Sequence, residues 1–264
     1  MIPLNQIQCF ILDMDGTIYL GGQVILGAHE LLGLFEKRNI PYYFFTNNSS
    51  KSPEDYLYKL EELDFGKFSR DKLITSGDVT ALYILNTFGK NAKAYVVGTE
   101  SLIKQLTLKG IDCSDSKHPD CVVVGFDTTY TFDKAKRAVD LLRHGVPFLA
   151  TNIDAVCPLE GGQVLPDCAS ICAMLTHATG KHPKYLGKPF VETAAYIKKA
   201  TGVPPNKTAI IGDRLYTDMR LALDNGMCAI GVLSGEMTQR DIDHSDSPLH
   251  YVFNSVLDLF MSMK

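Results

Sequence analysis

Short apolar runs alternate with longer amphipathic segments along the whole chain, and this alternation restricts the fold more than any other feature of the sequence. The runs that predict strands are residues 7–12, 42–46, 94–97, 121–124, 148–150, 185–186, 208–211 and 229–232. Apolar residues spaced at i, i+3 and i+4 predict helices over residues 28–37, 53–63, 79–88, 102–108, 134–142, 170–178, 191–200 and 215–223. Because this order is typical of parallel βαβ units, we expect an α/β fold with a doubly wound parallel sheet.

The composition supports a folded protein and excludes several classes. With 264 residues, 45% of them hydrophobic, the chain can bury a full core, and its length fits either one large domain or a core domain with a smaller inserted one. A net charge of −4, with no run of more than two basic residues, disfavours nucleic-acid binding. The seven cysteines form no C-x-x-C pair, which predicts reduced thiols in a cytoplasmic protein. No apolar stretch is long enough to span a membrane, and the N-terminus lacks the features of a signal peptide.

The most informative segment is FILDMDGT at residues 10–17, where an apolar strand runs into two aspartates followed by Gly-Thr. Ligands bind at the carboxyl ends of strands in open parallel sheets, so Asp13 is expected at the floor of a site. A turn at Gly16 would let Asp15 reach the other side of a substrate. An Asp-Gly pair is also common in an Asx-type turn at the end of a strand.

A second pair of carboxylates follows another apolar strand, in the sequence AIIGDRLYTD at residues 209–218. Asp213 stands at the end of the strand, and Asp218 lies five residues further on. Asp13 and Asp213 on neighbouring strand ends would form an oxygen-rich pocket suited to Mg²⁺. The alternative for Asp213 is the N-cap of the following helix.

Two further polar segments occur at the ends of predicted strands. Thr46 and Asn47 begin a run of hydroxyl and amide side chains that could hold phosphate oxygens. Lys188, between a glycine and a proline, could neutralise a phosphoryl group together with a nearby carboxylate. Each segment alone is an ordinary loop, but together with the aspartates they predict a phosphate site.

These residues resemble, in order, motifs one to four of the haloacid dehalogenase-like phosphohydrolase superfamily: D-M-D-G-T at 13–17, Thr46, Lys188, and Gly212-Asp213 with Asp218. The Asn47-Asn48 doublet and the long insertion between motifs two and three are similar to the NagD-type, or p-nitrophenyl phosphatase-like, branch. The resemblance implies a Rossmann-like core over residues 1–77 and 184–264, with an inserted α/β cap domain over residues 78–183. It therefore covers essentially the whole chain.

The resemblance also implies the role of each site residue. Asp13 would be the nucleophile that forms an aspartyl-phosphate, and Asp15 the general acid and base. Thr46, the Asn47 backbone and Lys188 would hold the phosphoryl group. Asp13, the Asp15 carbonyl oxygen and Asp213 would bind Mg²⁺, and Asp218 would orient Lys188 or a water on the metal.

The expected function is Mg²⁺-dependent hydrolysis of small phosphomonoesters, such as nucleotide, sugar or related metabolite phosphates. A phosphotransferase or mutase using the same aspartyl-phosphate is the alternative, and a receiver-like phospho-switch without turnover is a remote one. In the cap, Asn152 and Asp154 occupy a polar turn and are weak candidates for contacting the leaving group. A homodimer is compatible with the family.

Overall fold

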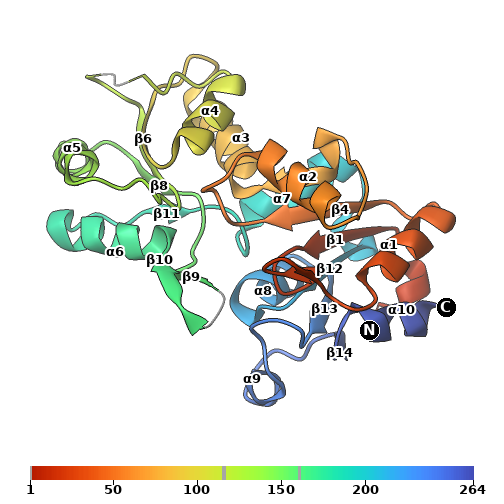
Figure 1. Ribbon diagram of the computed structural model, residues 1–264. Helices are drawn as coiled ribbons and strands as arrows, with labels where there is room; N and C mark the ends of the chain where they lie inside the picture. Colours follow the sequence, from red (N-terminus) through yellow and green to blue (C-terminus); the bar gives the residue numbers. More distant parts are fainter. Residues whose placement is uncertain (1, 115–116, 160–161) are drawn as a thin grey trace. The chain divides into compact units, whose positions relative to one another are not determined.

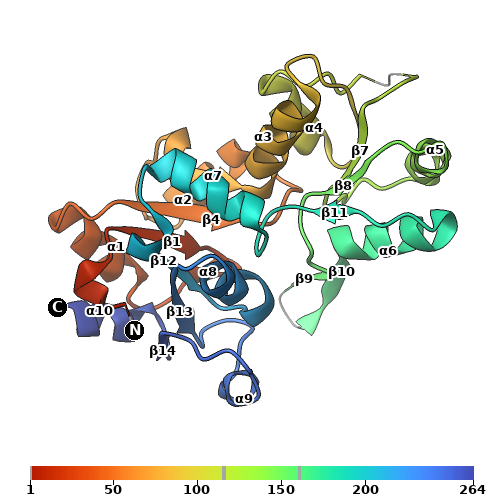
Figure 2. The ribbon, with the colours of Figure 1, turned by 180° about the vertical axis from the view of Figure 1, so that it is seen from behind.

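The chain folds around two separate parallel sheets, and the computed structural model describes residues 2–114, 117–159 and 162–264. Two compact units contain these sheets (Figure 1; Figure 2). Unit 1 comprises Met1–Thr46, Leu57–Ile74 and Lys188–Lys264, and unit 2 comprises Asn47–Tyr56 and Thr75–Gly187. No helix in the described ranges is both long and apolar enough to cross a membrane.

A six-stranded sheet forms the centre of unit 1, in the order β14-β13-β12-β1-β4-β5. Its strands are β1 (Cys9–Asp13), β4 (Tyr42–Thr46), β5 (Leu73–Thr75), β12 (Thr208–Gly212), β13 (Cys228–Val232) and β14 (Tyr251–Phe253). β1 pairs in parallel with β12 on one side and with β4 on the other. All residues of β12 and β13 are buried, as expected for strands covered on both faces.

The helices of unit 1 are α1 (Ala28–Lys37), α7 (Val191–Thr201), α8 (Arg220–Asp224), α9 (Gln239–Asp243) and α10 (Val256–Met263). α1 packs against α10, and α7 packs against α8. α1 lies on the near side of the sheet in Figure 1, and α7 lies on the near side in Figure 2, which gives the view from behind. A hairpin of β2 (Tyr19–Leu20) and β3 (Gln23–Val24) follows β1. The helix α2 (Pro53–Glu62) is divided between the units, because the first segment of unit 2 ends at Tyr56 and unit 1 resumes at Leu57.

Unit 2 contains a four-stranded sheet in the order β11-β8-β7-β6, and a β9-β10 hairpin. Its elements are α3 (Ser76–Phe88), β6 (Ala94–Val97), α4 (Glu100–Leu108), β7 (Cys121–Val124), α5 (Phe132–Arg143), β8 (Phe148–Ala150), β9 (Val156–Pro158), β10 (Val164–Pro166), α6 (Cys168–Thr179) and β11 (Lys184–Tyr185). Val122 and Val124 of β7 face a core shared with α5 and α6, whereas Cys121 and Val123 face a core shared with α3 and α4. The alternation of side chains along a strand therefore gives this sheet a separate core on each face.

The α/β fold expected from the sequence, with a parallel core sheet and a separate inserted sheet, is confirmed. The limits predicted for the inserted domain, residues 78–183, stay a prediction. Several short elements were missed, namely β2, β3, β5, β9, β10, β14, α9 and α10. Residues 215–223 are helical as expected, but the first part (Leu215–Met219) is π-helical, and α8 begins only at Arg220.

Candidate active site

Three predicted site residues lie at the carboxyl ends of three adjacent parallel strands of unit 1. Asp13 ends β1, Thr46 ends β4, and Asp213 directly follows β12. β1 lies between β4 and β12, so the strand order reverses there. Such a reversal is where open α/β sheets bind ligands.

Lys188 bridges two of the carboxylates. Its Nζ donates to Asp13 Oδ1 at 2.5 Å and to Asp218 Oδ1 at 2.7 Å. The side chain is only 3% exposed, and its Nζ lies 5.0 Å from the centre of the Phe45 ring. Burial opposes the charge, but the two carboxylates outweigh it and raise the pKa of Lys188 above its ordinary value. Lys188 is therefore a buried cation that faces the end of β1.

Asp213 completes a cluster of three carboxylates. One oxygen from each of Asp13, Asp213 and Asp218 lies within 4.8 Å of the others. Asp213 Oδ2 accepts from the Glu236 N–H at 2.7 Å, whereas the buried Oδ1 has no hydrogen-bond partner among the described residues. Asp213 does not form the N-cap that the sequence also allowed, because that position is Arg214.

The electrostatics of the cluster favour a cation. Burial, followed by the charges on Asp13 and Asp218, raises the pKa of Asp213 to about 8. Burial likewise raises the pKa of Asp218 to about 6, although Lys188 acts in the opposite direction. A divalent metal ion would provide both the positive charge and the partner that Asp213 Oδ1 lacks. The residues present therefore fit a hard divalent cation.

Two glycines allow the backbone to approach Asp213 closely. Gly16 has a φ of +85°, and a Cβ at Gly16 or Gly235 would overlap the Asp213 carboxylate. Ser234 Oγ also donates to the Gly16 carbonyl oxygen at 2.8 Å. Glycine is therefore needed at position 16 for two reasons: the turn after β1 has a positive φ, and the Asp213 carboxylate leaves no room for a side chain. Sequence reasoning missed the segment 234–236, although a polar Ser-Gly-Glu at a strand end was a usable signal.

Asp15 differs from Asp13 in its surroundings. Its side chain reaches solvent, yet desolvation by the surrounding protein raises the pKa of its carboxyl above the ordinary value. The charge on Asp13 acts in the same direction, whereas Lys59 and Arg214 oppose it. A carboxyl with a raised pKa is suited to donating a proton near neutral pH.

The remaining predicted residues lie in unit 2. Asn47 is buried, and Asn152 and Asp154 are 0% and 2% exposed. The side chains of Asn152 and Asp154 both hydrogen bond to Asn47, at 2.9 Å each. Sequence reasoning had placed Asn152 and Asp154 in a polar turn but had not connected them with Asn47.

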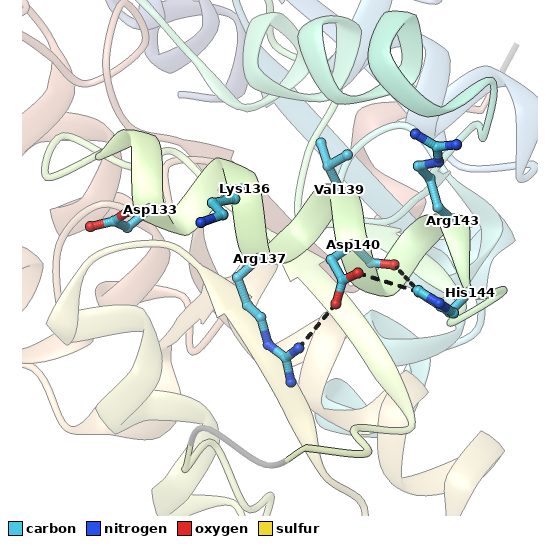
Figure 3. Close-up of a pocket in the computed structure, with 7 residues that line it drawn as sticks. All are labelled: Asp133, Lys136, Arg137, Val139, Asp140, Arg143 and His144. Atoms are coloured by element: carbon cyan, nitrogen blue, oxygen red, sulfur yellow. Dashed lines mark hydrogen bonds and ion pairs between the residues drawn. The ribbon is translucent and has the colours of Figure 1, made fainter.

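A surface pocket in unit 2 lies along α5 and is lined by Asp133, Lys136, Arg137, Val139, Asp140, Arg143 and His144 (Figure 3). Two of its side chains contact the Asp140 carboxylate: Arg137 Nη1 at 3.2 Å and His144 Nδ1 at 3.4 Å (Figure 3). None of the predicted site residues is among these lining residues. The pocket therefore does not contain the carboxylate and lysine cluster.

Two family models match the chain. The model described as haloacid dehalogenase-like hydrolase matches residues 10–112, and one described as HAD-hydrolase-like matches residues 185–259. The chain is 31% identical to an acid sugar phosphatase of Staphylococcus aureus, over 96% of each chain. The structure is similar to that of a 4-nitrophenylphosphatase from Thermotoga maritima, with a TM-score of 0.94, 37% identity and 99% of each chain covered. It is also similar to NagD from E. coli, with a TM-score of 0.87, 28% identity, and 96% of this chain and 98% of that one covered.

Proposed function

The chain belongs to the haloacid dehalogenase-like hydrolase family, in the branch of NagD and the p-nitrophenyl phosphatases, and we propose that it hydrolyses small phosphomonoesters through a phosphorylated Asp13. The observation that carries the proposal is the position of Lys188 Nζ between Asp13 and Asp218, two carboxylates that form a cluster with Asp213. This arrangement gathers a carboxylate nucleophile, a fixed positive charge and a candidate metal site at one end of a sheet.

In the first half of the reaction, a carboxylate oxygen of Asp13 attacks the phosphorus atom. The bond from phosphorus to the leaving oxygen breaks, and Asp15 donates its proton to that oxygen. The raised pKa of Asp15 favours the protonated form that this step needs. Lys188 neutralises negative charge on Asp13 and on the transferring group.

In the second half, Asp15 removes a proton from a water molecule, whose oxygen attacks the phosphorus atom. The bond between phosphorus and Asp13 breaks, which releases inorganic phosphate and restores the carboxylate. Thr46 and the backbone of Asn47 hold the phosphoryl oxygens during both steps. Asp218 keeps Lys188 in place through the 2.7 Å hydrogen bond.

Asp13, Asp213 and the carbonyl oxygen of Asp15 would hold a Mg²⁺ ion. When bound, this ion supplies positive charge to the phosphoryl oxygens. Such an ion would account for the grouping of the three carboxylates and for Asp213 Oδ1, which has no hydrogen-bond partner in the described part of the chain.

The substrate class follows from the names of the relatives, which act on sugar phosphates and on 4-nitrophenyl phosphate. The direct test is release of inorganic phosphate from p-nitrophenyl phosphate, sugar phosphates and nucleoside monophosphates, with Mg²⁺ and with excess chelator. We expect release that depends on Mg²⁺ and needs no added alcohol. Transfer of the phosphoryl group to an added alcohol, with no release of inorganic phosphate, would identify a phosphotransferase instead. No release from any substrate would contradict the proposal.

A further inference from the structure

Asn47, the residue bonded to Thr46, is held by three side chains of unit 2. Its side-chain amide donates to Asp154 Oδ2 at 2.9 Å. Its carbonyl oxygen accepts from Asn152 Nδ2 at 2.9 Å and from Ser76 Oγ at 2.7 Å. Asn152 and Ser76 are fully buried, and Asp154 is 2% exposed. Both polar ends of Asn47 therefore have buried partners.

Asn152 and Asp154 also orient each other. The Asp154 N–H donates to Asn152 Oδ1 at 3.0 Å, which forms an Asx turn soon after β8. Because Asn152 uses its oxygen in this turn, its amide nitrogen is directed to Asn47. The turn thus presents a donor to the carbonyl of Asn47 and an acceptor to its side chain.

The identity of these side chains is informative. Burying a carboxylate costs free energy unless it is hydrogen bonded. A turn that needed only to pack could use residues without charge, whereas Asp154 supplies a strong acceptor for an amide. Its position therefore suggests a requirement to hold Asn47 in one conformation.

We propose that Asn152 and Asp154 are positioning residues, which fix the backbone of Asn47 for the transferring phosphoryl group. The proposal rests on the function proposed above, in which that backbone holds the phosphoryl oxygens. Misplacing a group by about 1 Å can cost about 10²-fold in rate. This role differs from the contact with the leaving group that the sequence suggested for the same two residues.

The kinetic test compares Asp154→Ala with the wild-type protein on two substrates with different leaving groups, p-nitrophenyl phosphate and glycerol phosphate. Positioning predicts that kcat/KM falls by about 10-fold to 100-fold, by the same factor for both. Competitive inhibition by inorganic phosphate, which has no leaving group, should weaken as well. A loss specific to one substrate, with phosphate inhibition unchanged, would overturn the proposal in favour of a leaving-group contact.

Four further variants exclude a simple loss of structure. Asp154→Asn keeps an oxygen that can accept from Asn47, and we expect it to restore most of the activity. The double variant Asn47→Ala/Asp154→Ala should lose little more activity than Asn47→Ala alone, because Asp154 acts through Asn47. The matched control is Asp127→Ala, since Asp127 is a buried aspartate soon after β7 that pairs with Lys134 at 2.7 Å. This control should keep its activity, and an equal loss in it would contradict a specific role for Asp154.

Hydrogen exchange tests the same inference without turnover. In Asp154→Ala, the backbone N–H groups of residues 47–50 should exchange faster than in the wild-type protein, and in Asp127→Ala they should not. Unchanged exchange over residues 47–50 in Asp154→Ala would overturn the positioning role, even if the variant loses activity. Absence of phosphate release by the wild-type protein would refute the proposed function, and the exchange result would still decide whether Asp154 fixes Asn47.

Discussion

Asp13 and Asp15 are two residues apart, yet their surroundings suit them to different roles. Asp13 accepts a hydrogen bond from the buried Lys188. Asp15 reaches solvent, and desolvation raises the pKa of its carboxyl. Asp13 is thus paired with a buried cation, as suits a nucleophile, whereas Asp15 has the raised pKa that suits a proton donor.

The first prediction concerns proton donation by Asp15. In Asp15→Asn, formation of the intermediate should slow by about 10²-fold or more for a sugar phosphate, because an alcohol leaves poorly without a proton. The loss should be much smaller for p-nitrophenyl phosphate, whose leaving group is stable as an anion. Single-turnover measurement of leaving-group release checks this difference. Equal losses for the two substrates would refute the role of Asp15 as the acid.

The second prediction concerns Asp213 and stability. Its pKa is raised to about 8 in the folded chain, so the fold binds this proton more tightly than the unfolded chain does. Without metal, the contribution of Asp213 to the free energy of unfolding should therefore fall as the pH rises from about 4 to about 8. Mg²⁺ should reverse this loss, so it should raise Tm more at pH 8 than at pH 5.

Asp213→Asn is the matched variant for that measurement. It removes the charge but keeps the shape, so it should abolish most of the increase in Tm, about 5 °C or more, that saturating Mg²⁺ gives the wild-type protein. In chelator, the variant should be at least as stable as the wild-type protein at pH 8, because a buried negative charge is gone. An unchanged response to Mg²⁺ would show that the metal binds elsewhere.

At the scale of elements, the parts of the site that the sequence predicted are those that depend on single strand ends. Asp13, Thr46 and Asp213 could be located because β1, β4 and β12 are apolar runs followed directly by polar residues. The contacts of Asn47 with Asn152 and Asp154 could not be predicted, because 105 and 107 residues separate the partners. β5 and β14, with three residues each, are too short to show a period.

The π-helical turn before α8 could not be predicted from the sequence either. Its sequence has the helical spacing of apolar residues, so the periodicity predicted one continuous helix. A Cβ at Gly212 would overlap Asp218, so the chain after β12 turns tightly back against the end of the strand. π-helical turns are frequent at functional sites, and this one carries Asp218 to Lys188.

The third prediction concerns the segment after β13. In Gly235→Ala, the new Cβ would overlap the Asp213 carboxylate, so Asp213 or the segment must move. We expect kcat to fall by about 10-fold or more and the Mg²⁺ concentration for half-maximal activity to rise. The control is Gly33→Ala in α1, where a Cβ meets no atom within 4 Å. Wild-type kinetics in Gly235→Ala would show that this segment does not constrain Asp213.

At the scale of the whole molecule, the two units have separate sheets. The carboxylates of the candidate metal site, Asp13, Asp213 and Asp218, all belong to unit 1. The buried network around Asn47 belongs to unit 2. The candidate metal site and the positioning network can therefore be perturbed separately.

The fourth prediction follows from this division. A ligand stabilises the structure to which it binds, so Mg²⁺ should slow hydrogen exchange at β1 and β12 of unit 1. It should leave exchange at β7 and β8 of unit 2 nearly unchanged, unless the units unfold together. Hydrogen exchange with and without Mg²⁺ checks this. Protection confined to unit 2 would contradict the location of the metal site.

The central claim is that the phosphoryl group is transferred to Asp13 before it reaches water. The most direct test is to quench the wild-type protein and Asp15→Asn in acid during turnover of p-nitrophenyl phosphate, and to locate the phosphate by mass spectrometry. We predict an acid-stable, base-labile phosphate on Asp13, present in larger amount in Asp15→Asn because hydrolysis of the intermediate is slowed. Phosphate on a different residue, or turnover without any phosphorylated enzyme in either protein, would contradict the account.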